Sequence, residues 1–280
     1  GYIKRTPITE YRTQRRGGKG LKGAKAEDED PIQHLFVAST HAYLLFFTNL
    51  GRVYWRKVYQ LPQLARDSRG RAIVNLLQLA EGEQIMDCRA VRDFEKEGSF
   101  LVMATAGGLV KKTPLKAYGR PMKAGIIAIK LREGDELVDV VVAEPGDELV
   151  LSTAHGMAIR FRQSDVRAMG RNSSGVKGIA LVGDDKVVGM VVAEPDACLL
   201  TVCAHGYGKR TPFGPNLDAE EDRSEPDNGS DEETGDNQNG ADELLVEDPG
   251  GAFDEEEEVS SQRSYRTQRR GGKGLRDIKT

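Results

Sequence analysis

The 280-residue chain has few of the features that mark an enzyme, a secreted scaffold or a membrane protein. Its three cysteines are too few for a disulfide framework and suit a reducing cytosol. It has no run of 18 apolar residues and no signal peptide, so a membrane-spanning or secreted protein is not expected. P-loop, HExxH and GxSxG motifs are also absent. What the chain does have is repetition and an uneven distribution of charge.

The few metal-binding residue types form no convincing site. Cys198, Cys203 and His205 are close in sequence, but positions 198 and 203 differ in parity and face opposite sides of a strand. His155 and His205 directly precede glycines, and His tolerates left-handed backbone better than most residues. We interpret both as turn residues and predict no metal site.

The string Tyr-Arg-Thr-Gln-Arg-Arg-Gly-Gly-Lys-Gly-Leu occurs twice without a change, at residues 11–21 and 265–275. Its glycines can adopt positive φ and let main-chain N–H groups approach a ligand closely. Its cations can donate charge-assisted hydrogen bonds to phosphate. We therefore predict loops that bind a polyanion, namely a nucleic-acid backbone. We call the first box Gln14, Arg15, Arg16, Gly17, Gly18, Lys19 and Gly20. We call the second box Gln268, Arg269, Arg270, Gly271, Gly272, Lys273 and Gly274.

The repetition extends beyond the boxes. Residues 1–7 return almost unchanged as residues 206–212, and weaker copies lie between them. Turn glycines at positions 1, 51, 108, 156 and 206 are spaced by roughly 50 residues, a period typical of propeller blades or solenoids. Each repeat contains short runs rich in Val, Ile, Leu, Phe and Tyr, bounded by Gly, Asn, Asp or Pro. The sequence therefore predicts an all-β fold of about five blades.

Cations recur at similar places in every repeat, on the strand that follows the turn glycine. This phase predicts that they share one strand face or rim, where they contact phosphate. We call the following residues the hairpin cations: Lys4, Arg5, Arg52, Arg56, Lys57, Lys111, Lys112, Arg160, Arg162, Lys209 and Arg210.

One segment differs from the repeats. Residues 218–258 hold 19 carboxylates and one basic residue, Arg223, with few apolar side chains, a composition typical of disorder. This segment carries a charge of −18, so the rest of a chain of net charge −4 carries +14, which favours nucleic acid as a partner. We predict blades at 1–213, an acidic disordered insertion in the fifth blade at 214–262, and a return of that blade with the second box at 263–280.

The tethered polyanion lies in sequence between two groups of cations. Such a segment has a high effective concentration at neighbouring sites. We predict that it competes with DNA as an autoinhibitory brake. The alternative is a solvated loop that only aids solubility.

The first box resembles the signature heptapeptide of the C-terminal domain of the A subunit of bacterial DNA gyrase. The resemblance includes residues 58–62, 166–170 and 206–211 and covers nearly all of the chain outside the acidic segment. The motif is specific, because the related subunit of topoisomerase IV lacks or degrades it. The resemblance implies a β-pinwheel, a propeller-like ring of six four-stranded blades whose basic rim bends and wraps duplex DNA without sequence specificity.

The resemblance also implies a functional context. The DNA wrap lets gyrase introduce negative supercoils, using ATP and Mg²⁺ held elsewhere in the holoenzyme, so no cofactor is expected in this chain. Expected partners are double-stranded DNA, the N-terminal region of the gyrase A subunit and the gyrase B subunit. The expected location is the bacterial cytoplasm at the nucleoid, with no membrane. The family's catalytic tyrosine lies in the N-terminal region, so this chain is not expected to cut DNA.

Three departures from the family pattern accompany the resemblance. The chain has a second perfect box in its fifth repeat, its acidic residues lie in an insertion rather than a tail, and it stops where a sixth blade should begin. An incomplete six-bladed ring is therefore expected as an alternative to a closed one. Because residue 1 follows no strand of its own, we expect the chain to be a piece of a longer protein.

Other functions remain as alternatives. A topoisomerase IV C-terminal domain is the nearest of them. A protein-binding β-propeller would need an exposed aromatic hot spot, against which the single tryptophan, Trp55, argues. An enzyme built on a propeller funnel would need a polar catalytic cluster, which the sequence does not suggest.

Overall fold

The computed structural model of the chain describes residues 1–11, 32–214 and 265–279. The first box and the acidic segment lie outside the described residues. The described part is all-β, with strands of two to seven residues joined by turns and 3-10 helices of three or four residues. None of its helices has the length and apolar character needed to cross a membrane. The predicted all-β class is confirmed.

Three four-stranded antiparallel sheets form the centre of the molecule, and each is built on a hairpin. The hairpins are β2 (Tyr43–Thr48) with β3 (Arg52–Lys57), β6 (Phe100–Thr105) with β7 (Leu109–Pro114), and β10 (Glu148–Thr153) with β11 (Met157–Arg162). The inner strands, which pair with the first strand of each hairpin, are β5 (Ile85–Val91), β9 (Leu137–Ala143) and β13 (Val187–Val192). The outer strands, which pair with the second, are β8 (Ile126–Ile127), β12 (Val176–Lys177) and β16 (Leu275–Arg276).

Each outer strand is supplied by the repeat that follows the hairpin it joins. Strand β8 comes after the β6–β7 hairpin in sequence but pairs with β3, and β12 comes after β10–β11 but pairs with β7. Strand β16 follows the second box and pairs with β11, not with the hairpin of its own repeat. Residues 265–279, the described part of the segment predicted to return to the fifth blade, therefore complete the sheet of the preceding hairpin, and the fifth repeat contributes to two sheets.

Two incomplete sheets flank the three complete ones. Strand β1 (Tyr2–Ile3) pairs with β4 (Arg71–Ala72), in the way that second strands pair with outer strands elsewhere. Strands β14 (Cys198–Val202) and β15 (Gly208–Pro212) form the last hairpin. Short 3-10 helices follow the second strands or precede β5: η1 (Ile8–Glu10), η2 (Val58–Gln60), η3 (Ile73–Asn75), η4 (Leu115–Tyr118) and η5 (Gln163–Asp165).

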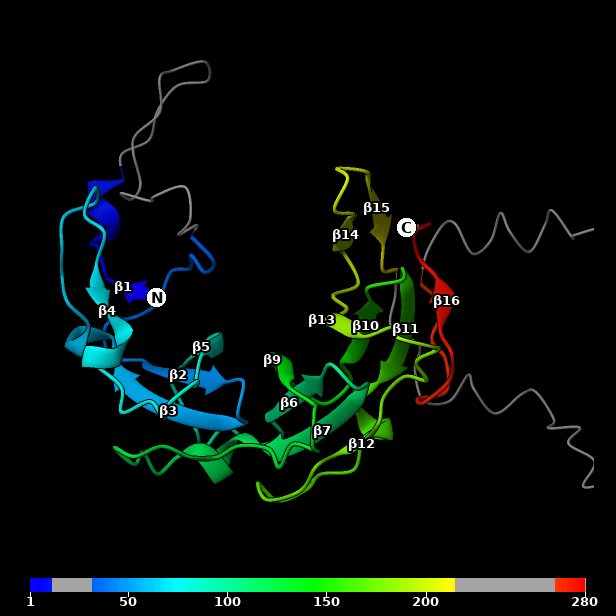
Figure 1. Cartoon of the computed structure of the whole chain (residues 1–280), viewed down its shortest axis with the longest axis horizontal. Coiled ribbons are helices and arrows are strands. Elements are labelled where there is room, and N and C mark those ends of the chain that lie inside the picture. The colour runs from blue at the N-terminus through cyan, green and yellow to red at the C-terminus, as the bar shows by residue number, and fades with distance from the viewer. Residues whose placement is uncertain (12–31, 215–264, 280) are drawn as a thin grey trace, which may run out of the picture.

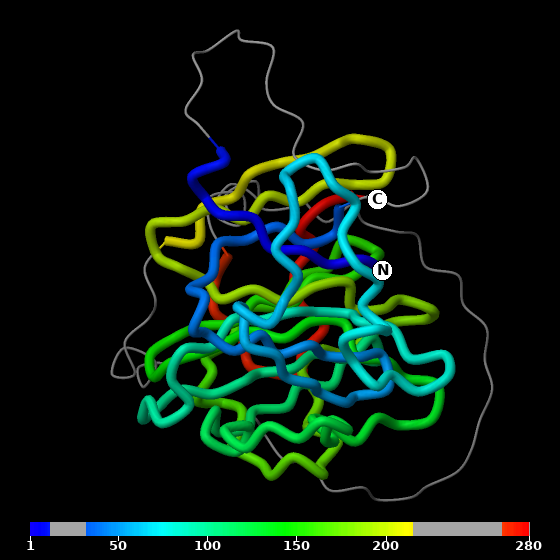
Figure 2. The backbone as a smooth tube through the Cα atoms, turned by 90° about the vertical axis from the view of Figure 1, so that its left-hand side faces the viewer, coloured from blue at the N-terminus to red at the C-terminus, as the bar shows by residue number. Residues whose placement is uncertain are grey.

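The sheets follow one another along an open arc (Figure 1). Strands β5, β9 and β13 lie toward its inside, whereas β4, β12 and β16 lie on its convex side (Figure 1). The ends of the arc, at β1–β4 and at β14–β15, lie apart across its opening, and both views place them at the same upper side of the molecule (Figures 1 and 2). The predicted blades are therefore present, and their described part does not close into a ring.

The hydrophobic core lies between consecutive blades. Along β6, Leu101 and Met103 pack toward the first complete blade, whereas Val102 and Ala104 pack toward the third. This alternation explains why the hairpin strands read as continuous apolar runs, since both of their faces are buried. Burying each large apolar side chain contributes roughly 1.5–3 kcal/mol. Because neighbouring blades share these cores, each blade depends on the next for stability.

Candidate nucleic-acid interface

Most hairpin cations bind main-chain carbonyl groups inside the protein. The clearest pattern involves the fourth residue after each turn glycine. Arg5 Nε donates to Leu61 O at 2.9 Å, and Lys112 Nζ donates to Gln163 O at 2.8 Å. In each case the carbonyl belongs to the next repeat and lies at its 3-10 helix. Trp55, at the same place in its repeat, donates from Nε1 to Tyr118 O at 3.0 Å. We call this hydrogen bond the inter-repeat clasp.

Arg160 makes the clasp from a buried position. Its guanidinium has 2% of its surface exposed and donates to the carbonyl oxygens of Phe213 and Tyr265. Its Nε also donates to Oε2 of Glu148, a fully buried carboxylate, at 2.6 Å. Thr267 donates to the other carboxylate oxygen at 2.9 Å. Such a hydrogen-bonded pair leaves neither charge without a partner, and it ties the last hairpin and the second-box segment to β11.

Lys111 is fully buried as well. Its ammonium group donates to Ala128 O at 2.6 Å and to Arg171 O. Burial, with a smaller contribution from the charge of Arg171, lowers the pKa of Lys111 to about 8. The neighbouring Lys112 lies over the Phe100 ring at 4.8 Å, and burial lowers its pKa too. Neither ammonium group can reach a phosphate without leaving its carbonyl partners.

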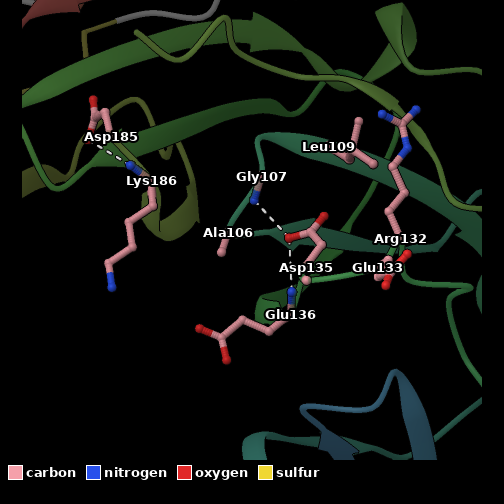
Figure 3. A pocket seen from close by; sticks show the side chains of 10 residues that line it. Ala106, Gly107, Leu109, Arg132, Glu133, Asp135, Glu136, Asp185 and Lys186 are labelled. Carbon is pink, nitrogen blue, oxygen red and sulfur yellow. Dashed lines mark hydrogen bonds between the residues drawn. The ribbon is translucent and has the colours of Figure 1, made fainter. Parts of the chain in front are cut away.

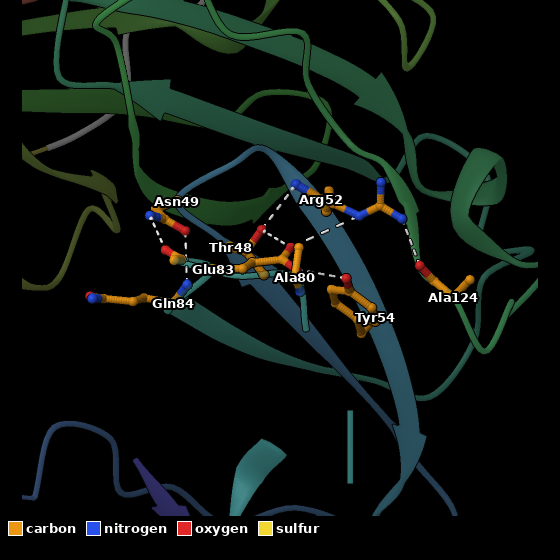
Figure 4. A network of polar contacts seen from close by, with 9 residues as sticks. Thr48, Asn49, Arg52, Tyr54, Ala80, Glu83, Gln84 and Ala124 are labelled. Carbon is orange, nitrogen blue, oxygen red and sulfur yellow. Dashed lines mark hydrogen bonds and ion pairs between the residues drawn. The ribbon is translucent and has the colours of Figure 1, made fainter. Parts of the chain in front are cut away.

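Arg52 belongs to a polar network around a buried carboxylate (Figure 4). Glu83 accepts hydrogen bonds from the hydroxyl of Thr48 at 2.7 Å and of Tyr54 at 2.8 Å. Arg52 Nε lies 3.9 Å from Glu83 Oε1, and Nη2 donates to Ala124 O at 2.6 Å. Burial and the hydrogen bond to Glu83 raise the pKa of Tyr54. The network joins the first hairpin to the loop that leads into β8.

The remaining hairpin cations are less buried, and most of them also have partners. Lys4 donates to Ser68 O at 2.8 Å, and Lys57 donates to His41 O at 2.8 Å while lying 3.5 Å from the Tyr43 ring centre. Arg56 donates to the carbonyl oxygens of Trp55 and Leu76, and Lys209 pairs with Asp277 Oδ1 at 3.0 Å. Arg162 is half-buried, whereas Arg210 is exposed and has no partner in the described part of the chain.

A second group of cations lies on the loops that lead into the outer strands. These rim loops are residues 61–72, 119–127, 166–177 and 265–276. Among them they contain a single carboxylate, that of Asp67. Their exposed cations, which we call the rim cations, are Arg69, Arg71, Arg120, Lys123, Arg167, Lys177, Arg266, Arg269, Lys273 and Arg276. The rim loops lie on the convex side with β4, β12 and β16 (Figure 1).

The second box forms the central part of the last rim loop, residues 265–276. Gly271 N donates to Gly178 O at 2.8 Å, and Ala180 N donates to Gly272 O at 2.8 Å, so the box is bonded to the segment that follows β12. Arg270 donates to Asp165 O at 3.0 Å and to Lys177 O. By contrast, Arg269 and Lys273 are exposed and have no partner among the described residues. The second box therefore combines main-chain hydrogen bonds, which fix it to the neighbouring repeat, with two exposed cations that have no partner among the described residues.

Gly274 shows why the box ends in glycine. Its φ is +78°, and a Cβ there would lie 2.6 Å from Ala158 O, so no other residue fits without strain. Gly70, Gly125 and Gly175 hold the equivalent place before β4, β8 and β12, and all have positive φ. The second box thus occupies the rim-loop position of its repeat. An alignment of this box with its degenerate counterparts in the other repeats would have revealed the rim cations outside the boxes, which are absent from the predicted site residues.

An open cleft of about 450 Å³ lies between consecutive blades near the β6–β7 turn (Figure 3). Its carboxylates serve the turns: Asp135 Oδ1 accepts from Gly107 N at 2.8 Å, and Asp185 Oδ1 accepts from His155 N at 2.9 Å. Although burial opposes the shift, such hydrogen bonds lower the pKa of Asp185. No group of three His, Cys, Asp or Glu that could hold a metal ion occurs within residues 1–11, 32–214 and 265–279.

Comparisons with known proteins agree with this architecture. The family described as "DNA gyrase C-terminal domain, beta-propeller" matches residues 1–39, 42–92, 99–144, 147–194 and 260–280. The A subunit of DNA gyrase from Salmonella typhimurium is 51% identical over 211 residues, which are 75% of this chain and 24% of that protein. The A subunit of DNA gyrase from Streptomyces coelicolor is 49% identical over 187 residues, 64% of this chain and 22% of that protein. The chain thus spans about a quarter of the length of these relatives.

Two solved structures are similar in fold and sequence. A DNA gyrase A C-terminal domain superposes with a TM-score of 0.62 at 29% identity, covering 76% of this chain and 68% of that one. A C-terminal domain of DNA topoisomerase IV superposes with a TM-score of 0.63 at 29% identity, covering 76% of this chain and 64% of that one.

Proposed function

Since the chain belongs to the family of DNA gyrase C-terminal domains, we propose that it binds duplex DNA along its rim loops and bends the duplex around its convex side. The observation that carries this proposal is the row of rim cations, which four consecutive repeats present on loops with a single carboxylate. Cations in such a row contact phosphates, which position a duplex and convey little sequence information. The binding is therefore non-specific.

The hairpin cations act indirectly in this proposal. Lys111, Lys112 and Arg160 are buried against carbonyl groups, so they hold the blades at a fixed curvature instead of contacting phosphate. Bending a site of 20–30 base pairs costs roughly 1–6 kcal/mol by elastic estimates. A preformed convex row of cations offsets this cost, because the protein does not have to rearrange when the DNA bends.

The wider context of the proposal follows from the family. In a gyrase holoenzyme the chain would act with the N-terminal region of the A subunit and with the B subunit, in the cytoplasm at the nucleoid. ATP and Mg²⁺ would be used elsewhere in the assembly. The wrap would give that enzyme its negative-supercoiling activity.

Religation of a nicked circle in the presence of the purified chain tests the proposal. A wrap of fixed hand should change the linking number of the closed product in proportion to the protein added. The salt dependence of binding provides a second measurement, since several phosphate contacts imply a steep log–log slope. An unchanged linking number together with a slope near one ion would contradict the proposal.

The first box can be tested in the same assay. Replacing residues 14–20 with alanine should abolish the change in linking number while leaving most of the DNA affinity, because the rim cations remain. A variant that changes the linking number like the parent would assign the box to blade architecture alone.

A topoisomerase IV C-terminal domain is the second candidate, favoured by the structural likeness to that domain. The linking-number assay separates the two functions. Such a domain should bind the same duplex without a wrap that depends on the first box.

A further inference from the structure

One rim loop, residues 119–127, differs from the other three because it exposes apolar side chains. Met122 is 58% exposed and Ile127 is 45% exposed, and no other large apolar side chain is exposed in the four rim loops that the structure describes. Pro121, beside Met122, is exposed as well. The loop leads from the second complete blade into the outer strand β8 of the first, so both neighbouring blades are complete. We call Met122 and Ile127 the apolar rim residues.

The same positions in the other rim loops hold polar residues, charged residues or residues with little side chain. Each position can be counted from the glycine of positive φ that precedes the outer strand. Met122 lies three residues before Gly125, and Ile127 lies two residues after it. The counterparts of Met122 are Asp67, Asn172 and Gly271, and those of Ile127 are Ala72, Lys177 and Arg276. The architecture of a rim loop therefore does not require an apolar side chain at either position.

The main chain around the apolar rim residues is held in place by several contacts. Gly125 N donates to Met122 O at 3.0 Å and closes a tight turn. Arg52 Nη2 donates to Ala124 O at 2.6 Å, and Gly125 lies so close to the Tyr54 ring that a Cβ would be 2.7 Å from a ring carbon. Both side chains belong to the polar network of the first hairpin (Figure 4). A ligand that binds here therefore does not have to order the loop first.

Two cations are carried on the same loop. Arg120 and Lys123 are exposed and have no partner among the residues that the structure describes. Both belong to the rim cations, for which phosphate contacts are proposed above. Phosphates border the grooves of a duplex, so apolar side chains on the same tight loop as two phosphate-binding cations are placed to meet a groove.

The direction of bending decides which groove fits. An apolar side chain inserted from the minor groove opens a base step and bends the duplex toward the major groove, away from the inserted side chain. Such a bend is opposite to the proposed one, in which the duplex curves around the convex side of the protein. In the major groove, the base edges expose one apolar group, the 5-methyl group of thymine. Contact with this methyl group buries apolar surface on both partners and leaves the base stack closed.

We propose that the apolar rim residues contact thymine methyl groups in the major groove of the bound duplex, while Arg120 and Lys123 bind adjacent phosphates. This inference rests on the proposed function, because it needs a duplex on the rim loops. The phosphate contacts remain indifferent to sequence, and this loop adds a modest preference for thymine at one place on the rim. The preference favours placements of the wrap in which thymine lies at this loop.

Two duplexes of one sequence, the second with uracil in place of every thymine, test this proposal by fluorescence anisotropy with the full chain. The two duplexes differ only in the methyl groups. The parent should bind the thymine duplex more tightly, by about fourfold for each methyl group that becomes buried. The salt slope should be the same for both duplexes, because a methyl group is uncharged.

A double substitution assigns the preference to the apolar rim residues. Met122→Gln/Ile127→Thr removes apolar surface and adds no charge, so this variant should bind both duplexes equally and keep the parent's salt slope. Val182→Gln changes a side chain that is 67% exposed outside the rim loops, and it should keep the preference. Thermal unfolding checks the fold of each variant. If Ile127→Thr weakens the pairing of β8, Met122→Gln alone replaces the double variant and should reduce the preference.

A methyl group on another base provides an independent measurement. Replacing cytosine with 5-methylcytosine in the uracil duplex should restore tighter binding by the parent and not by the double variant. Equal binding of the thymine and uracil duplexes by the parent would overturn the proposal, as would an undiminished preference in the double variant. Equal binding with a steep salt slope would leave the proposed function standing, whereas a slope near one ion would contradict the proposed function itself.

Discussion

The hairpin cations and the rim cations consist of the same two residue types and recur with the same period, yet they serve different purposes. Lys111 on the hairpin strand β7 is fully buried and donates to two carbonyl groups. Lys123, on the rim loop before β8, is exposed and has no partner among the described residues. A cation on a strand buried on both faces has to find acceptors inside the protein, whereas a cation on a loop outside the outer strand faces solvent. The position of a cation relative to the sheet therefore decides its role.

The largest effect should come from removing a buried hairpin cation. Arg160→Met leaves Glu148 buried without its ion-pair partner, and breaking such a pair costs about 3–5 kcal/mol. Urea unfolding should show this loss. The rim substitution Arg167→Met, at an exposed site, should change stability by less than about 0.5 kcal/mol. Equal losses of unfolding free energy in the two variants would contradict the distinction between hairpin cations and rim cations.

A second prediction concerns pH. The pKa of Lys111 is about 8 in the folded protein, below its ordinary value of 10.5. The unfolded chain therefore binds more protons between these values, and stability rises with pH across that window. Relative to Lys111→Met, the parent should gain about 2–3 kcal/mol between pH 7 and 10. Denaturant titrations of both proteins at several pH values measure this gain, and a difference that stays flat would show an unshifted, solvated ammonium group.

The glycine at the end of the second box provides a smaller test of rim architecture. Gly274→Ala should lower stability by about 1–3 kcal/mol, because its backbone has positive φ and its Cβ meets Ala158 O. Gly170→Ala is the matched control on another rim loop, since a Cβ there meets nothing within 4 Å. Thermal unfolding compares them, and equal stability would mean that the loop can shift to accommodate a side chain.

The free cations of the second box should affect DNA binding without affecting stability. The double substitution Arg269→Ala/Lys273→Ala should lower the log–log salt slope by about 2, at roughly 0.9 for each phosphate that is no longer neutralised. Lys57→Ala on a hairpin strand should leave the slope unchanged, because that ammonium group is bonded to His41 O. Fluorescence anisotropy with a labelled duplex measures both. A larger change in the salt slope for Lys57→Ala than for the double substitution would show that DNA contacts the hairpin cations instead.

The smallest effect is expected from the acidic segment. Deleting residues 218–258 should tighten DNA binding modestly at low salt, since a tethered polyanion competes for nearby cations. Screening should remove the difference at high salt. The linking-number change per bound chain should increase as well. Unchanged values of both would leave the segment a role in solubility only.

The sequence was most informative about the hairpins. The turn glycines predicted at positions 51, 108, 156 and 206 all have positive φ, and the apolar runs before them are strands. It could not show where an outer strand pairs, because two-residue strands such as β12 carry almost no pattern of their own. Because β16 is equally short, its sequence also did not reveal that it pairs with β11, which belongs to the hairpin of the preceding repeat.

The fate of individual cations was also difficult to predict. Lys111 and Lys123 look equivalent in one dimension, and only the burial of β7 on both faces separates them. The boxes were interpreted as anion-binding loops, and this interpretation did not reveal a second, architectural role of the second box. The main chain of Gly271 and Gly272 is bonded to the neighbouring repeat, and no count of charges or glycines could reveal that.

The supply of each outer strand by the next repeat has a mechanical consequence. In the proposed complex the bent duplex would recoil, and its pull on the rim loops would be transmitted to β8, β12 and β16. Each of these strands is held by hydrogen bonds to one blade and by the covalent chain to the following one. Tension applied at any one loop is thus divided between two blades and passed along the arc. Consecutive blades are therefore linked in an overlapping series. No single blade would bear the elastic force of the bent DNA alone.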